Sequence, residues 1–255
     1  MILFSTAPRR LTVSRERQRG NIAPVLLGVI ASAYRKRRLG DSATYRAAVI
    51  ADSPAGYWRL AETTGNTANN EIGGQPNGTY TANFTLGGST LLSGISSLQL
   101  TGSGYVQLSS GYSFTSNFTI EALVRRAGTN AAHGTVMMRR FNAYMFAAQD
   151  SQLILNKDQS AVVGTANVTL NDDWPHHVAV TVTSGNVWTL WHNGANMASG
   201  STTAFGAGTT PFFIGTDFSS VFADQFIGGL GEVAIYSTAL SSGQILAHAQ
   251  AAGQA

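Results

Sequence analysis

Carboxylates are the residues in this sequence that could carry acid–base chemistry. The chain holds 13 Asp and Glu residues and no cysteine, which excludes a thiol nucleophile and thiolate metal sites. Retaining glycoside hydrolysis needs two carboxyl groups about 5–5.5 Å apart. The strand-like segment 120–126 carries a single acid, Glu121, and the neighbours Asp172 and Asp173 would point to opposite faces of a strand. We therefore expect no enzyme, and we expect Glu121 to satisfy hydrogen-bond donors at a sheet edge.

Aromatic side chains are the candidates for stacking on sugar rings. Trp and Tyr combine a large apolar ring with a polar tip, so they serve equally well in a core and in a binding site. The period-2 alternation of a strand would place Trp188 and Trp191 on opposite faces. At least half of the aromatic residues must therefore lie in the core. The ligand-binding candidates are Tyr57, Trp58, Tyr144, Trp188 and Trp191.

The basic residues are concentrated at the N-terminus. Residues 1–40 hold nine basic residues and one acidic residue, a net charge of +8, whereas residues 41–255 hold seven basic and twelve acidic residues, a net charge of −5. We expect residues 1–44 to form a basic arm that docks on a partner protein, while nothing suggests that the remainder binds nucleic acid. An export signal or anchor and a nucleic-acid tail are the alternatives for the arm. Its docking residues are Arg9, Arg10, Arg15, Arg17, Arg19, Arg35, Lys36, Arg37 and Arg38.

An apolar run over 21–33 lies between the basic clusters of the arm. A 13-residue helix reaches roughly 20 Å, which is too short for about 30 Å of hydrocarbon. A basic start, an apolar stretch and Ala31-Ser32-Ala33 resemble a secretory signal. The basic cluster over 35–38 would follow such a cleavage site almost directly, which favours the docking arm.

From Tyr45 onwards the sequence consists of short alternating segments separated by Gly, Asn, Asp and Ser. Segments 118–124 and 177–182 alternate as half-buried strands do, and 97–100 and 105–108 flank Gly102-Ser103-Gly104 as a hairpin would. More than eight strands without intervening helices predict one antiparallel β-sandwich domain over 45–255. The only convincing helix, 241–252, begins with the capping-box pattern of Ser241 and Gln244.

Several motifs together resemble laminin-G-like domains of the concanavalin A-like lectin/glucanase family. They are ADSPAGYWRL over 51–60, NGTY over 77–80, FTIEA over 118–122, WPHHVAVT over 174–181 and IGGLGEVAIY over 227–236. The resemblance implies an all-β jelly-roll sandwich with two sheets of six or seven strands. Members bind glycans, proteins or lipids, and some are purely architectural. The opening motif is similar to that of phage tail and virion-surface proteins in particular.

The same resemblance implies a calcium ion near the rim of the sandwich, a hard cation that takes oxygen ligands. The matching positions carry Asn70 and Glu71 at the first place, and Glu232 at the second, where Gly231 replaces an expected Asp. Half of the negative charge is missing, so we expect any calcium site on Asn70, Glu71 and Glu232 to be weakened or lost. The neighbours His176 and His177 cannot both face one partner from a strand, so we expect no zinc site.

These observations predict a non-enzymatic phage virion structural protein of the tail or capsid surface. Its arm would dock on other virion proteins in a symmetric assembly, and its jelly roll would be displayed, with host cell-surface glycans as possible ligands. The alternative is a secreted bacterial carbohydrate-binding or adhesion module with an N-terminal export signal. A glycoside hydrolase is the least favoured function.

Overall fold

In the computed structural model, the described residues are 37–108, 112–126, 134–139, 143–157, 161–208, 212–216 and 225–255. They belong to a compact unit that begins at Arg37. The apolar run 21–33 and the predicted docking residues Arg9, Arg10, Arg15, Arg17, Arg19, Arg35 and Lys36 lie outside the described residues.

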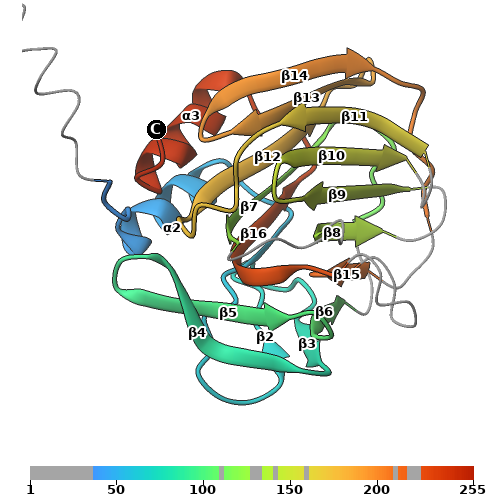
Figure 1. The fold of residues 1–255 in the computed structure, drawn as a ribbon. Helices are drawn as coiled ribbons and strands as arrows, with labels where there is room; N and C mark the ends of the chain where they lie inside the picture. Colours follow the sequence, from blue (N-terminus) through green and yellow to red (C-terminus); the bar gives the residue numbers. More distant parts are fainter. Residues whose placement is uncertain are drawn as a thin grey trace, which may run out of the picture. The chain divides into compact units, whose positions relative to one another are not determined.

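Two antiparallel sheets of eight strands each form the body of the domain (Figure 1). The first sheet has the order β14-β13-β12-β7-β16-β5-β4, and β1 also pairs with β16. Its strands are β1 (Gly56–Trp58), β4 (Phe84–Leu92), β5 (Ile95–Thr101), β7 (Phe118–Arg125), β12 (His176–Val182), β13 (Val187–His192), β14 (Ala195–Ser201) and β16 (Ile227–Tyr236).

The second sheet has the order β11-β10-β9-β8-β15-β6-β3-β2. Its strands are β2 (Thr67–Ala68), β3 (Gly78–Thr81), β6 (Tyr105–Leu108), β8 (Thr135–Arg139), β9 (Tyr144–Ala148), β10 (Gln152–Lys157), β11 (Ala161–Asn167) and β15 (Phe212–Ile214). This architecture confirms the predicted antiparallel jelly-roll sandwich.

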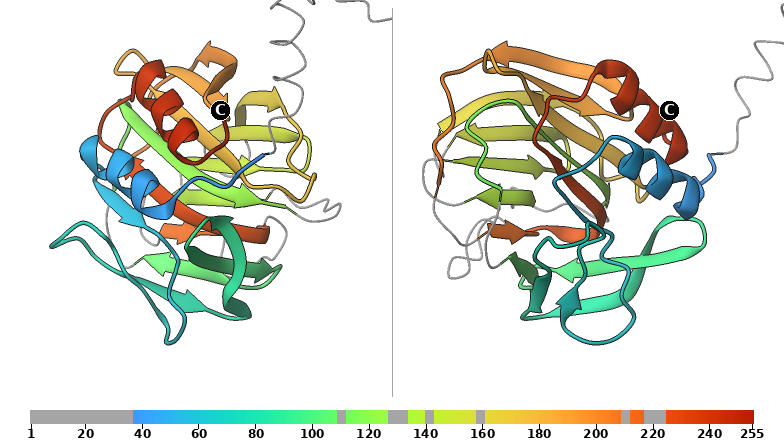
Figure 2. Two further views of the ribbon diagram at one scale, coloured as in Figure 1. Left: turned by 90° about the vertical axis from the view of Figure 1, so that its left-hand side faces the viewer. Right: turned by 180° about the vertical axis from the view of Figure 1, so that it is seen from behind.

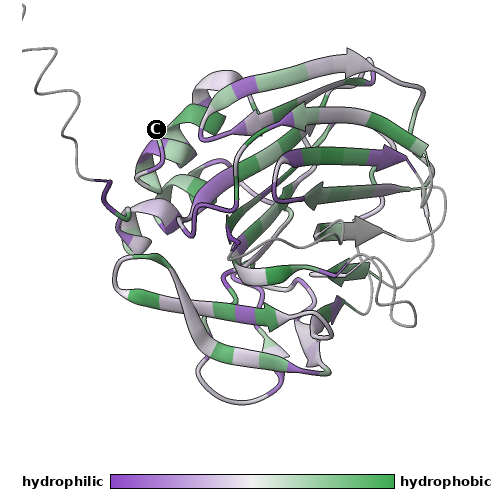
Figure 3. Ribbon diagram, viewed as in Figure 1, coloured by the Kyte–Doolittle hydropathy of each residue, from purple (hydrophilic) through white to green (hydrophobic). Residues whose placement is uncertain are grey.

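The main core lies between the two sheets, because every second residue of the central strands points inwards. Phe118 of β7 stacks on Tyr144 of β9 with ring centroids 4.8 Å apart, and Phe212 of β15 packs edge-on against Tyr144. Many residues in the strands of both sheets are hydrophobic, whereas many residues in the connecting loops are hydrophilic (Figure 3).

Strands β5 and β6 correct the predicted hairpin over 97–108. β5 pairs with β4 and β16 in the first sheet, whereas β6 pairs with β3 and β15 in the second. The connection through Gly102, which has a φ of +100°, therefore crosses from one sheet to the other. Both segments have apolar residues to bury, and placing them on opposite layers lets each strand face the same core.

Two helices lie side by side on the outer face of the first sheet (Figures 1 and 2). The predicted C-terminal helix is α3 (Ser242–Ala251), and its capping box of Ser241 and Gln244 is confirmed. The other helix, α2 (Ser42–Ala51), is not predicted by the sequence pattern, although the side chain of Asp41 caps its first turn. No helix within the described ranges has the length and apolar character that crossing a bilayer requires.

The helices change the environment of the central strands. β7 and β12 are buried on both faces instead of being half-buried, because α2 and α3 cover the face that points away from the core. A second apolar cluster fills this layer, including Tyr45 of α2, Ile245 of α3 and Trp191 of β13. The polar residues of the outer face are consequently enclosed, and they form the candidate site.

Candidate functional site

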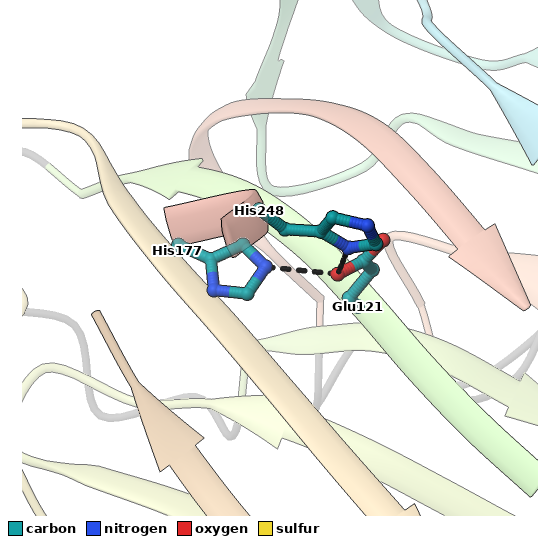
Figure 4. A group of neighbouring side chains, drawn as sticks. All are labelled: Glu121, His177 and His248. Atoms are coloured by element: carbon teal, nitrogen blue, oxygen red, sulfur yellow. Dashed lines mark hydrogen bonds and ion pairs between the residues drawn. The ribbon is translucent and has the colours of Figure 1, made fainter. Parts of the chain in front are cut away.

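Glu121 is the centre of a buried polar cluster between the first sheet and the two helices (Figure 4). Its Oε2 lies 2.9 Å from His177 Nε2 on the adjacent strand β12 and 2.9 Å from His248 Nδ1 on α3. The hydroxyl of Tyr236 on β16 donates to Oε1. His248 also reaches the end of α2, where its Nε2 lies 3.0 Å from Asp52 Oδ2. The cluster therefore joins three strands and both helices.

The electrostatics of this cluster favour charged forms of Glu121 and His248. Burial alone would raise the pKa of Glu121, but the charge of His248 and the hydrogen bonds from His177 and His248 outweigh it and lower that pKa. Burial would lower the pKa of His248, but the carboxylates of Glu121 and Asp52 raise it above its ordinary value. His248, which lies between the carboxylates of Glu121 and Asp52, thus ties α3 to the sheet and to α2.

Glu121, His177 and His248 also bring together the donor types that zinc accepts. A metal-bound histidine donates its second ring N–H to an acceptor, and Asp52 could fill that role for His248. For His177 no such acceptor exists within the described part of the chain, since its buried Nδ1 has no hydrogen-bond partner. The donor set therefore fits a metal only in part, and hydrogen bonds and ion pairing account for its geometry.

The three predicted calcium ligands all have partners within the protein. Asn70 Oδ1 accepts from the backbone N–H groups of Tyr57 and Ile72. Glu71 Oε2 lies 2.7 Å from the Nε of Arg46 on α2. Each side chain is thus already engaged in holding the segment around residue 70 against β1 and α2.

Glu232 is buried at a bulge of β16, where it has a φ of +53°. It accepts hydrogen bonds from Tyr57 and from Arg59, whose Nη2 lies 3.0 Å from Oε1. Burial raises the pKa of Glu232 even though Arg59 opposes that rise. Because a guanidinium neutralises each of the two carboxylates, this arrangement does not fit a calcium ion without rearrangement, and calcium binding stays a hypothesis.

The five aromatic candidates are all buried, with exposed fractions of 8% or less. Trp58, Tyr144 and Trp188 belong to the core between the sheets, and Tyr57 and Trp191 belong to the layer under the helices. As placed, none presents an open ring face to a sugar, which corrects the expectation that some of these rings form a binding surface. Packing between the two sheets buries Trp58, Tyr144 and Trp188, and the additional helix layer buries Tyr57 and Trp191 on the other face of the first sheet.

The carboxylates that the structure describes all have partners within the protein. Each of the nine that the structure describes accepts a hydrogen bond or an ion pair from the protein. Glu121, which we expected at a sheet edge, does satisfy donors but lies on a central strand. Asp172 and Asp173 lie in the bend before β12 and pair with Arg37 and Arg125 respectively.

Arg37 connects the start of the compact unit to a histidine pair. Arg37 Nη1 lies 2.7 Å from Asp172 Oδ2. The other oxygen, Asp172 Oδ1, lies 2.8 Å from His176 Nε2. His176 Nδ1 in turn lies 2.9 Å from His192 Nε2. Burial and the neighbouring His176 lower the pKa of His192 to about 4. Arg38 is exposed. At least one basic residue of the predicted arm is therefore paired within the domain itself.

Some partners of the predicted site residues escaped the sequence analysis, including a histidine and an arginine. His248 lies on a helix 127 residues from Glu121, and Arg46 lies on the unpredicted helix α2. The Asp41 N-cap followed by a run rich in Ala was the available signal for α2, because a capping Asp before good helix formers favours a helix start.

Comparison with known proteins places this geometry in a family. Residues 100–246 match the model of the concanavalin A-like lectin/glucanases superfamily. Domain 4 of the extracellular arabinanase AbnA from Geobacillus stearothermophilus, solved in complex with arabinotriose, superposes with a TM-score of 0.60 at 18% identity. That match covers 77% of this chain and 98% of the other. A search of curated protein sequences finds no significant match.

Two further structures have the same fold. The binding domain of Paraclostridial Mosquitocidal Protein 1 has a TM-score of 0.57 at 15% identity, over 76% of this chain and 51% of the other. Trypanosoma rangeli sialidase, solved with sialic acid, has a TM-score of 0.53 at 15% identity, over 76% of this chain and 32% of the other. The architecture therefore occurs in a domain of an arabinanase, in part of a binding domain and in part of a sialidase chain. On its family match and its two-sheet fold, the chain belongs to the concanavalin A-like lectin/glucanase superfamily.

Proposed function

We propose that this protein is a non-enzymatic glycan-binding module. The observation that carries the proposal is the likeness of 77% of this chain to an arabinanase domain whose structure contains arabinotriose. The burial of Glu121 and Glu232 among structural partners supports binding over hydrolysis, since glycoside hydrolysis needs two carboxyl groups that flank the scissile bond of a substrate.

A glycan array with the labelled full chain tests the binding. We expect selective retention of a small set of glycans, and we expect no release of reducing sugar when the same glycans are incubated with the protein. Cleavage of a bound glycan that persists through repeated purification would overturn the non-enzymatic assignment. Absence of binding across the array would overturn the binding function.

We further propose that the module is displayed on a phage virion, with residues 1–44 docked on capsid or tail proteins in a symmetric assembly. The concentration of positive charge in residues 1–40 supports an arm that meets acidic groups of a partner. Repeated copies on one particle would strengthen weak glycan binding through avidity. Cross-linking mass spectrometry of native particles should join the arm to a virion protein.

A secreted carbohydrate-binding or adhesion module is the second candidate, motivated by the apolar run over 21–33 after a basic start. N-terminal sequencing of the native protein separates the two. A first residue of Met1 or Ile2 supports the virion protein, and a start near Tyr34 supports export.

A further inference from the structure

A polar pocket opens on the outer face of the first sheet, and none of its lining residues belongs to the buried clusters around Glu121 and Glu232. Its volume is about 160 Å³, and its lining comes from β4, β5, β7, β16 and the bend before β12. The lining residues are Gly88, Ser89, Gln99, Arg125, Asp173 and Gly228.

A glycine of β16 lets β4 pack closely over the sheet beside this pocket. Gly229 of β16 is paired in register with Gln99 of β5 on one side and with Arg125 of β7 on the other. A Cβ at Gly229 would come within 2.1 Å of Ser89 Oγ, so only glycine lets β4 bring Ser89 over the sheet at this point. Ser89 thereby lies in the pocket lining together with the long polar side chains of Gln99 and Arg125.

Arg125 is held in one orientation. Its Nε donates to both the backbone oxygen and the Oδ1 of Asp173, at 3.0 Å each. No described residue accepts a hydrogen bond from its two Nη atoms. Because the Nε side is fixed, the paired Nη groups form a pre-oriented fork of donors.

The remaining groups of the pocket supply both donors and acceptors. Gln99 uses its Nε2 on the backbone oxygen of Leu100, which leaves Oε1 without a partner among the described residues. The hydroxyl of Ser89 likewise makes no hydrogen bond within the described part of the chain. Asp173 is 62% exposed and neutralises Arg125. The pocket thus offers mixed hydrogen-bonding groups with no net charge.

From this geometry we infer that the pocket binds the vicinal hydroxyl groups of one neutral sugar residue. Two adjacent hydroxyls can accept from the Arg125 fork and donate to the oxygens of Gln99 and Asp173, whereas an anionic group would face the Asp173 carboxylate. The small volume of about 160 Å³ suits the edge of one ring and not an oligosaccharide. This inference rests on the proposed glycan-binding function and assigns a site to it.

The pocket lining contains no aromatic ring, so a single site lacks the stacking contribution that strengthens many sugar complexes. Affinity for one sugar should be weak, and selectivity should come from hydroxyl geometry. Such a site gains strength when many copies act together, in agreement with display on a symmetric particle.

The test is ligand-detected NMR on the full chain with the methyl glycosides of arabinose, galactose, glucose and mannose, and with N-acetylneuraminic acid as the anionic comparator. The variants are Arg125→Lys, which keeps the charge but removes the fork, and Ser89→Ala. Arg46→Lys is the matched control, because Arg46 also pairs through its Nε with a carboxylate but lies outside the pocket.

We expect at least one neutral glycoside to bind, with roughly tenfold weaker binding for Arg125→Lys, a smaller loss for Ser89→Ala and none for Arg46→Lys. Glycan-array binding that survives both pocket substitutions would overturn this site and leave the glycan-binding function intact. Binding confined to the acidic sugar would overturn the choice of a neutral ligand. A protein that binds nothing on the array or in solution would overturn both proposals.

Discussion

Replacing Glu121 by alanine removes the one carboxylate that three buried donors share. His177, His248 and Tyr236 would each lose an acceptor, and the charge on His248 would keep only Asp52. Removing one partner of a buried ion pair costs about 3–5 kcal/mol, because the other charge stays buried without compensation. We therefore expect Glu121→Ala to lower the free energy of unfolding by about 3–5 kcal/mol. Glu121→Gln, which keeps the shape and one acceptor oxygen, should cost less.

Urea denaturation followed by tryptophan fluorescence measures this loss, since Trp58, Trp188 and Trp191 are all buried in the fold. Glu71→Ala is the matched control, because Glu71 also pairs with a cation, at 2.7 Å, but is 26% exposed. Such a pair contributes about 0–1 kcal/mol. The double substitution Glu121→Ala/His248→Ala should recover about 1–3 kcal/mol relative to the sum of the single losses.

A loss below about 1 kcal/mol for Glu121→Ala, equal to that of the Glu71→Ala control, would refute the buried-cluster reasoning. It would mean that water reaches the layer under the helices. Normal stability combined with complete loss of glycan binding would instead assign Glu121 to a ligand site.

Three further outcomes follow from the same structure. The pKa of His248 is raised in the folded protein, so its stabilising contribution is complete below pH about 6.5 and is lost as the pH rises through the folded pKa. In urea titrations, the difference in unfolding free energy between the protein and His248→Gln should therefore shrink as the pH rises over that range. Calcium at millimolar concentration should leave the melting temperature unchanged, because Arg46 and Arg59 neutralise Glu71 and Glu232. A calcium-dependent rise in melting temperature that Glu232→Gln abolishes would restore the hypothesis of a calcium site. Trp188→Ala should lower the free energy of unfolding by about 3–5 kcal/mol in calorimetry or denaturation. The reason is that the Trp188 ring packs against Gly164 and Gly200 at the edge of the sandwich. A loss under about 1 kcal/mol would show that this edge is loosely packed.

The fold class could be predicted because its signals are local. The alternating segments 118–124 and 177–182 and the capping box at Ser241 each depend on residues a few positions apart, and the structure confirms the two strands and the helix start. The family motifs added the two-sheet architecture. A strand's own sequence, however, states only which residues share a face, and not what covers that face.

Tertiary structure alone decided the roles of the polar and aromatic residues. Glu121 lies 56 residues from His177 and 127 residues from His248, so no spacing in the sequence links them. The covering of the outer face by α2 and α3 buried Tyr57 and Trp191, which alternation alone left open as ligand contacts. The sequence by itself thus determined the strands and their two-layer packing. Contacts between distant elements determined which side chains lie buried, which charges are neutralised and where a polar pocket stays open, because burial depends on every element that packs against a surface.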